Sequence, residues 1–488
     1  MATYDYDMGI LGGGAAGLTI AAGAARAGAK TLLVEKEEKL GGDCLHYGCV
    51  PSKTLIRTAR VYHHLRNAAR FGLPAIVAPR PDFREIAERI RAVIGEIQKH
   101  DSEERFCGLG ARIRFGQARF VDEHTISLGS ERLSARSWTI ATGSSAAIPP
   151  VEGLRETPYL TNREVFSLDK LPASLAIIGG GPIGIELAQA FTRLGSKVTV
   201  VEFLPRILSA DDPDMTDTLR EVLEAEGVTF HLNSAVQGVR NLGTEREVTF
   251  KTGNEIKRIR AEALLVAAGR KVNLEGLGLE EIGVAFDRKG LKLDARLRTN
   301  RPHIYGAGDV TGVYPFTHAA GYEGGIVLSN AVFRLPRKVN YTFLPWVTFT
   351  DPELASIGLN EQAARVQGIA YRVWSEAFAD NDRSLAEDER VGRIKLLLDE
   401  KERPLGVQIL GPRAGDLLGE WVAALNGKVS LSTLAAAVHP YPTLAEISKR
   451  VAGNVLAEKI FSERVKKTLR FFFSLKGRAC QPPTKTCS

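Results

Sequence analysis

The feature of this sequence that most constrains its fold is a glycine-rich unit that occurs twice. The first copy reads DMGILGGGAAGLTIAAGAARAGAKTLLVE over residues 7–35, and the second reads SLAIIGGGPIGIELAQAFTRLGSKVTVVE over residues 174–202. In each copy an apolar strand runs into three glycines, a helix follows, and a second strand ends in glutamate. This arrangement lets the backbone approach a pyrophosphate, which the N-terminus of the helix then binds. The sequence therefore predicts an α/β protein with two dinucleotide-binding domains.

Each of these two units, or fingerprints, ends in a glutamate 23 residues after its first glycine. This glutamate can accept hydrogen bonds from a ribose. Two glycine-rich turns without a ligand are the alternative. At the second site Glu202 would repel a 2′-phosphate, which favours NADH over NADPH, while Arg206 weakens that preference. The predicted residues are Gly12, Gly14, Gly17 and Glu35 in the first copy and Gly179, Gly181, Gly184 and Glu202 in the second.

Cysteine content and charge exclude several classes of protein. Five cysteines in 488 residues are too few for a secreted disulfide scaffold, so we expect a cytoplasmic protein. The net charge of +7 is mostly interspersed, and we expect no nucleic acid partner. Met8–Ala25 carries no charge over 18 residues, but its six glycines indicate a buried strand and a close-packed helix, not a transmembrane span.

A pair of cysteines lies in the stretch GGDCLHYGCVPSKTL, residues 41–55. Cys44 and Cys49 can be structural thiols, a metal pair or a redox disulfide. The pair lacks a second set of ligands at zinc-site spacing. Pro51 suits the first turn of a helix, which would place Cys49 near the positive helix end, with Lys53 close by. Both effects favour a thiolate, so we favour the redox disulfide and expect a flavin, FAD, at the first dinucleotide site.

Three further segments end a strand at a glycine turn. SWTIATGSS places Thr142 and Gly143 after a strand, and ALLVAAGRKVN places Gly269 in the same way. In HIYGAGDVTG, Asp309 can bind flavin ribityl hydroxyls or cap a helix. We expect Thr142, Gly143, Asp309 and Thr317 to contact FAD, and Gly269 to contact NAD.

These motifs, together with the C-terminal HPYPTLAE, resemble the flavoprotein disulfide reductases, which include dihydrolipoamide dehydrogenase, glutathione reductase and mercuric reductase. The resemblance extends to about residue 465. It implies two Rossmann-like domains, one for FAD and one for NAD, plus a C-terminal α+β dimerisation domain in a homodimer. We place the FAD-binding domain at residues 1–150 and 276–345, the NAD-binding domain at 151–275, the dimerisation domain at 346–465 and a basic aromatic tail at 466–488.

The resemblance also implies roles at the matching positions. Cys49 corresponds to the flavin-side thiol and Cys44 to the interchange thiol that meets the substrate. Lys53 would lie beside the flavin and pair with Glu186, for which an ordinary helix salt bridge is the alternative.

The C-terminal motif departs from that of the disulfide-reducing members, which carry a histidine base in His-Pro-x-x-x-Glu. Here the base position is Tyr441, with Glu446 retained. A tyrosine, with a pKa near ~10, is a poor base at neutral pH. His439 could substitute for it, and Tyr441 could also serve only in packing at the interface.

A tyrosine at this position resembles mercuric reductase, whose soft-metal substrate brings no proton to remove. We therefore expect NAD(P)H, with NADH favoured, to reduce a small thiol-reactive or soft-metal acceptor through Cys44 and Cys49. One alternative is a dihydrolipoamide dehydrogenase-like enzyme that uses His439. Another is a membrane-associated electron-transfer subunit with a protein or quinone acceptor.

The C-terminal segment contains two further features. Cys480 and Cys487 are either incidental thiols or transient soft-metal contacts that pass metal to Cys44 and Cys49, and we expect no permanent metal site. Residues 462–479 combine basic side chains with three consecutive phenylalanines. This tail can rest on an anionic membrane or dock on the dimer surface.

Overall fold

The computed structural model describes residues 3–480, which form two compact units. The first unit comprises Met1–Tyr341 with Thr348–Thr350, and the second comprises Thr342–Val347 with Asp351–Ser488. The domain boundaries given by the sequence stay predictions. Across residues 3–480, no helix combines the length and apolar character that a membrane crossing needs.

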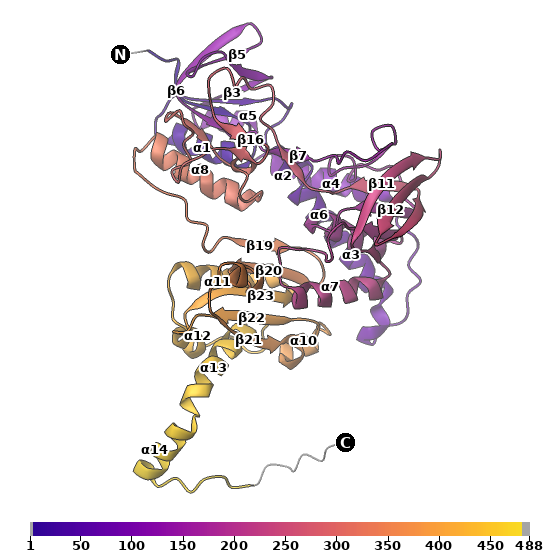
Figure 1. Cartoon of the computed structure of the whole chain (residues 1–488), viewed down its shortest axis with the longest axis vertical. Coiled ribbons are helices and arrows are strands. Elements are labelled where there is room, and N and C mark those ends of the chain that lie inside the picture. The colour runs from indigo at the N-terminus through magenta and orange to yellow at the C-terminus, as the bar shows by residue number, and fades with distance from the viewer. Residues whose placement is uncertain (1–2, 481–488) are drawn as a thin grey trace. The chain divides into compact units, whose positions relative to one another are not determined.

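The first sheet of unit 1 has the strand order β3-β2-β1-β6-β5-β4, with β18 paired to β6 (Figure 1). The pairs that involve β1, β2, β3 and β18 are parallel, and β2 is buried throughout, as expected for a sheet covered on both faces. The strands are β1 (Tyr6–Leu11), β2 (Thr31–Glu35), β3 (Ala111–Phe115), β4 (Ala118–Phe120), β5 (Thr125–Leu128), β6 (Glu131–Ile140) and β18 (Ile304–Gly306).

Two helices of small residues, α1 (Ala15–Arg26) and α8 (Thr317–Ala331), pack closely against each other. A Cβ atom at Gly23 would lie 2.2 Å from the Leu328 side chain, so this position has room only for glycine. The other helices of unit 1 outside the second sheet are α2 (Gly42–His46), α3 (Cys49–Arg66), η1 (Ala68–Phe71), α4 (Phe83–Gln98), α5 (Glu103–Gly108) and η2 (Asp309–Thr311).

The second sheet of unit 1 is parallel and has the order β10-β9-β8-β14. Its strands are β8 (Ser174–Ile178), β9 (Lys197–Val201), β10 (Thr229–His231) and β14 (Ala263–Val266), and its helices are α6 (Pro182–Leu194) and α7 (Pro213–Glu226). Smaller antiparallel sheets are formed by β11 (Ser234–Asn241), β12 (Arg246–Thr252) and β13 (Glu255–Ala261), by β7 (Ser144–Ala146) with β15 (Arg270–Val272), and by β16 (Phe286–Asp287) with β17 (Gly290–Leu291).

Unit 2 contains a five-stranded sheet with the order β19-β20-β23-β22-β21. Its strands are β19 (Pro345–Thr348), β20 (Glu353–Gly358), β21 (Arg372–Ala377), β22 (Arg393–Leu398) and β23 (Pro404–Gly411). Its helices are α9 (Glu361–Val366), η3 (Phe378–Asp380), α10 (Asp382–Ala386), α11 (Ala414–Asn426), α12 (Leu431–Ala436), α13 (Glu446–Ile460) and α14 (Glu463–Phe473). The fully buried Trp421 joins α11 to α13, because its indole N–H donates to Ser448 Oγ over 2.9 Å.

Candidate active site

The two cysteines lie on consecutive helices, the short α2 and the longer α3. Cys44 belongs to α2, and Cys49 is the first residue of α3, where Gly48 is the N-cap and Pro51 lies in the first turn, as predicted. Cys44 is half-buried and Cys49 is exposed, and both are thiols in this structure. The pair is therefore held at the N-terminal end of a helix, and Cys49 is the more exposed residue of the two.

The two thiols have opposite acidities. The hydrogen bond from Cys44, with smaller effects of Thr317 and of the charge of Lys53, lowers the pKa of Cys49 to about 6, against the opposing effects of burial and Glu186. The same bond to Cys49, with burial, raises the pKa of Cys44. Thr317 begins α8, and its Oγ1 lies 3.4 Å from Cys49 Sγ. At neutral pH the pair thus holds one thiolate, on Cys49, and one thiol.

Lys53 and Glu186 form the predicted pair. The Lys53 ammonium donates to Glu186 Oε2 over 2.8 Å, and the glutamate side chain is only 6% exposed. The other carboxylate oxygen of Glu186 accepts the backbone N–H of Phe349 at 2.8 Å, and Lys53 Nζ lies 4.4 Å from the centre of the Phe349 ring. Phe349, which the sequence analysis missed, completes this pair, so Lys53 is held in place near Cys49.

The first fingerprint fits a dinucleotide. Its helix α1 has Gly14 at the N-cap, and no described side chain caps it, so its first N–H groups can face an anion. A Cβ atom at Gly14 would meet only Gly42 Cα, at 3.9 Å, which leaves open space above the turn. Gly12 has a φ of +108° and lies against the Ala141 carbonyl, which requires glycine. Glu35 is buried and accepts the backbone N–H groups of Gly13 and Glu37.

The second fingerprint repeats these features at α6. Gly181 is its N-cap without a side-chain cap in the described chain, and a Cβ atom at Gly181 would meet nothing within 4 Å. Glu202 is buried and accepts N–H groups from Gly180 and Leu204. The guanidinium of Arg206 donates to the Asp211 carbonyl at 3.4 Å, within its own loop.

The glycine turns after β6 and β14 are connected to each other by hydrogen bonds. Gly143 and Gly269 have φ of +66° and +120°, and the strands that follow them, β7 and β15, pair antiparallel. The Thr142 hydroxyl donates to the Asn273 carbonyl over 2.6 Å, and the Asn273 N–H donates to Gly143 O over 2.9 Å. These contacts connect the two predicted cofactor sites within unit 1.

Asp309 lies in a polar network that the sequence did not reveal. It begins η2, accepts a hydrogen bond from the Ser144 hydroxyl and lies 3.6 Å from Arg270 Nε. Arg270 also donates to Ser144 and, over 2.9 Å, to Asp43 of α2. The only sequence signal for Arg270 is its position directly after Gly269. This arginine ties the element that carries Cys44 to the turn that carries Asp309.

A second unpredicted group is Glu323, which is fully buried on α8. It accepts hydrogen bonds from Gly308 N and from the Tyr341 hydroxyl, each over 2.6 Å. Burial, with the charge of Asp309, raises the pKa of Glu323 to about 7, and burial with the bond to Glu323 raises the pKa of Tyr341. A titrating carboxyl therefore lies directly behind the Gly308–Asp309 turn.

The C-terminal motif is described within unit 2. The Tyr441 hydroxyl donates to Asp382 over 2.9 Å, and this bond raises the pKa of a tyrosine that is 71% exposed. Glu446 accepts the backbone N–H of Thr443 at 3.2 Å. His439 is bonded to Glu420 of α11 over 2.9 Å, and its side chain is only 10% exposed.

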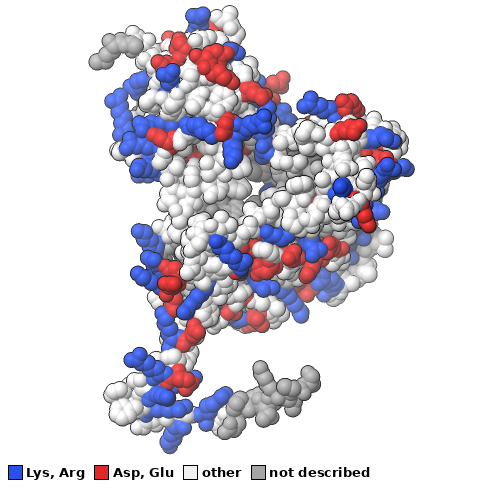
Figure 2. Space-filling view, in the orientation of Figure 1, with Lys and Arg blue, Asp and Glu red and all other residues white. Residues whose placement is uncertain are grey.

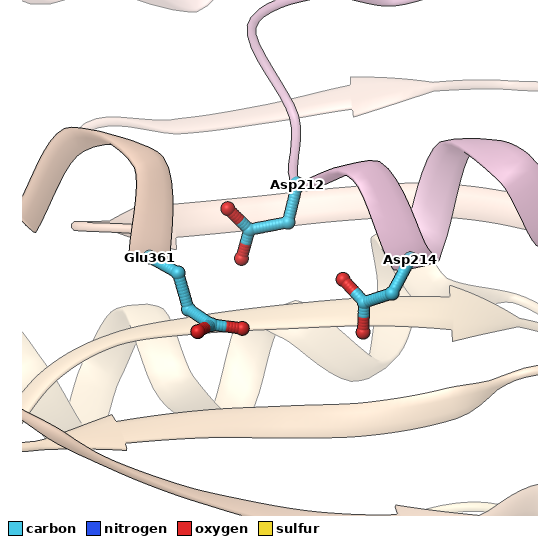
Figure 3. Close-up of side chains that lie close together, drawn as sticks. All are labelled: Asp212, Asp214 and Glu361. Carbon is cyan, nitrogen blue, oxygen red and sulfur yellow. The ribbon is translucent and has the colours of Figure 1, made fainter. Parts of the chain in front are cut away.

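Cys480 and Cys487 stay predictions as transient soft-metal contacts. Cys480 is exposed, and Cys487 lies outside the described residues. Figure 3 labels Asp212 and Asp214, which belong to the start of α7, where carboxylates stabilise a helix N-terminus. It also labels Glu361, the first residue of α9, which pairs with Lys395 over 2.9 Å.

Comparison with known proteins identifies the family. The pyridine nucleotide-disulphide oxidoreductase profile matches residues 6–324, and the dimerisation-domain profile of the same family matches residues 344–452. The chain is 34% identical to a mercuric reductase of Streptomyces lividans, over 92% of this chain and 95% of that protein. It is also 34% identical to a dihydrolipoyl dehydrogenase of Bacillus subtilis (strain 168), over 90% of this chain and 96% of that protein.

A solved structure agrees with this assignment. The Cu(II) complex of the HOCl-induced flavoprotein disulfide reductase RclA from Escherichia coli matches with a TM-score of 0.83 and 26% identity, over 93% of this chain and 100% of that one. The predicted mixed α/β fold is confirmed. The chain therefore belongs to the pyridine nucleotide-disulphide oxidoreductases, flavoprotein disulfide reductases that use FAD and NAD(P)H and carry a dimerisation domain.

Proposed function

We propose that this enzyme passes electrons from NADH to a soft-metal or other thiophilic acceptor held by Cys44 and Cys49, as a mercuric reductase does. The observation that carries the proposal is Tyr441 at the base position. Its bond to Asp382 holds its pKa above the ordinary value of 10, so it is unsuited to accept a thiol proton at neutral pH. A soft cation brings no such proton, and thiolates are its preferred ligands.

The acidities of the two thiols suit this acceptor. Cys49, with a pKa of about 6, is already ionised at neutral pH, whereas Cys44 keeps its proton until a cation replaces it. Binding a divalent cation between the sulfurs releases the Cys44 proton to water. Bound FAD would supply the electron pair that a hydride from NAD(P)H brings. For Hg(II), gain of two electrons gives neutral Hg(0), which the sulfurs release, and Cys44 regains a proton from water.

The Cu(II) complex of RclA supports a metal acceptor by analogy, because the structure of that related reductase was solved as a complex with Cu(II). The mercuric reductase of Streptomyces lividans supports it by similarity over nearly its full length. Both are properties of relatives. We extend them to this chain because it carries the thiol pair and Tyr441.

We assign FAD to the first fingerprint, where Gly12, Gly14, Gly17 and Glu35 hold the nucleotide and Asp309 and Thr317 hold the flavin side. Glu35 retains acceptor capacity beyond its two backbone partners, since a carboxylate has about four lone-pair sites. NADH goes to Gly179, Gly181, Gly184 and Glu202. The bond of Arg206 to Asp211 turns its guanidinium to its own loop, which supports NADH over NADPH.

The proposed enzyme is a cytoplasmic homodimer in which Tyr441 of each subunit faces the thiol pair of the other. The match to the dimerisation-domain profile supports the homodimer. The 71% exposure of Tyr441 in the single chain leaves its ring accessible to a partner subunit.

A second candidate is a disulfide reductase of the dihydrolipoyl dehydrogenase type that uses His439. The His439–Glu420 pair favours it, since a carboxylate that orients a histidine is the usual arrangement of a general base. The small exposure of His439 argues against it, because a thiol must reach the ring.

The experiment is an NADH-oxidation screen of the FAD-loaded enzyme with Hg(II), lipoamide, glutathione disulfide and quinones as acceptors. We expect Hg(II)-dependent turnover that is lost in Cys44→Ser and Cys49→Ser and kept in His439→Ala. Lipoamide turnover that disappears in His439→Ala would replace the proposal with the second candidate.

A further inference from the structure

The segment that follows the dimerisation domain forms an amphipathic helix, α14. Val465, Leu469 and Phe472 recur at the spacing that places side chains on one face of a helix. Lys467 and Arg470 are three residues apart and lie on the opposite face of the helix. Ser462 begins the helix as an N-cap that accepts the Val465 N–H. The helix thus presents one apolar and one basic face.

The apolar face has no cover within the described chain. No residue of α14 is buried, and Phe472 is 70% exposed. Figure 1 shows α14 running on from α13, away from the sheet of unit 2. The large apolar side chains exposed around α14 are Ile460, Phe461, Leu469, Phe471, Phe472, Phe473 and Leu475. On a protein surface, exposed apolar residues are normally scattered singly, whereas these residues form a group.

Almost all of the net charge of the chain lies in the same segment. Residues 462–488 contain seven Lys and Arg and one acid, a net charge of +6, while the whole chain carries +7. The other 461 residues therefore carry only +1. Figure 2 shows Lys and Arg side chains crowded along α14 beside uncharged ones. A second copy of this chain offers the segment no net negative charge, so the favoured occupant is an anionic surface.

We propose that α14 binds the surface of an anionic lipid bilayer. The Val465–Leu469–Phe472 face enters the boundary between headgroups and acyl chains, and the cations on the opposite face lie among the anionic headgroups. Phenylalanines next to basic residues are the composition that such interfacial helices use. This inference is independent of the proposed acceptor, because no residue of α14 belongs to the thiol or nucleotide sites.

The test is flotation of the FAD-loaded full-length enzyme with phosphatidylcholine vesicles that contain or lack phosphatidylglycerol. The charge variant is Lys467→Gln with Arg470→Gln and Lys476→Gln; Lys466 is left in place because Glu463 already pairs with it at 2.8 Å. Each cation near an anionic surface contributes about fivefold, so we expect binding to fall on the order of 100-fold. The double variant Leu469→Ser with Phe472→Ser should lower vesicle binding by at least about tenfold.

The matched control removes three exposed lysines elsewhere, by Lys197→Gln, Lys251→Gln and Lys401→Gln, and should bind as the wild type does. NADH oxidation and FAD content should be unchanged in all variants, which shows that they fold. Equal binding to vesicles with and without phosphatidylglycerol would overturn the proposal, as would a charge variant that behaves like the control. Self-association that depends on Phe472, without vesicle binding, would also overturn it and assign the face to a second copy.

Discussion

The hydrogen bond from Cys44 is the largest cause of the low pKa of Cys49, and removing it gives a direct test of the site. Cys44→Ala deletes the donor, whereas Cys44→Ser keeps a hydroxyl donor at nearly the same place. A hydrogen bond to a charged group contributes about 1.5–3 kcal/mol, and one pKa unit corresponds to about 1.4 kcal/mol. The Ala variant should therefore raise the pKa of Cys49 from about 6 to about 7–8.

The assay is the pH dependence of Cys49 alkylation by iodoacetamide, since only the thiolate reacts. The background should carry Cys107→Ser, Cys480→Ser and Cys487→Ser, so that Cys49 is the one remaining reactive thiol. At pH 7 the ionised fraction should fall from about nine-tenths to between about one-tenth and one-half in Cys44→Ala. Cys44→Ser should keep the midpoint near 6 or lower. A midpoint near 6 in Cys44→Ala would refute the reasoning.

Three other predictions concern Lys53, Glu323 and Tyr441. Lys53→Met leaves the buried Glu186 carboxylate without its ammonium partner. In urea titrations of the flavin-free chain it should lower the free energy of unfolding by about 2 kcal/mol, a value reduced for the partial exposure of Lys53. Lys53→Arg, which keeps a cation, should lower the free energy of unfolding by less. The pKa of Glu323 is raised from 4.5 to about 7 in the folded chain. Its contribution to the free energy of unfolding is therefore fully present below pH 4.5 and is lost as the pH rises through 7. Glu323→Gln cannot titrate, so thermal or urea unfolding between pH 4.5 and 8 should lack a fall of about 3 kcal/mol that the wild type shows. Tyr441→His places a group with a pKa near ~6.5 at the base position and should raise lipoamide turnover by about 100-fold or more, while Tyr441→Phe should not.

The local geometry of both nucleotide units could be predicted from the sequence, because the period of apolar residues and the glycine spacing act within about thirty residues. Strand β2 ends at Glu35, as predicted. Strand β9 ends one residue before Glu202, whose carboxylate turns back to bind Gly180 and Leu204. The helix that begins at Cys49 likewise follows from Pro51 and the preceding Gly48.

Contacts between distant segments could not be predicted from local pattern. The Lys53–Glu186 pair spans 133 residues and came from the family resemblance, while its Phe349 partner had no signal. Arg270 reaches Asp43 across 227 residues, a contact that depends on how β15 returns beside β7. Buried Glu323 was missed for another reason.

Glu323 lies in α8 among glycines, alanines and other small residues, where a lone glutamate reads as a solvent-facing side chain. Only the tertiary approach of Tyr341 and of the Gly308 N–H shows why a carboxyl is buried there. The same limit applies to His439, which lies outside the helices and meets its Glu420 partner on α11.

The central claim is that the thiol pair serves an acceptor whose reduction needs no proton-transferring group at residue 441. The most direct measurement is the stopped-flow reoxidation of NADH-reduced enzyme mixed with Hg(II) or with lipoamide at equal concentration. We predict that reoxidation by Hg(II) is at least about 100-fold faster, because lipoamide exchange lacks a general base at Tyr441. Reoxidation by lipoamide at the same rate as by Hg(II), or faster, would contradict the claim.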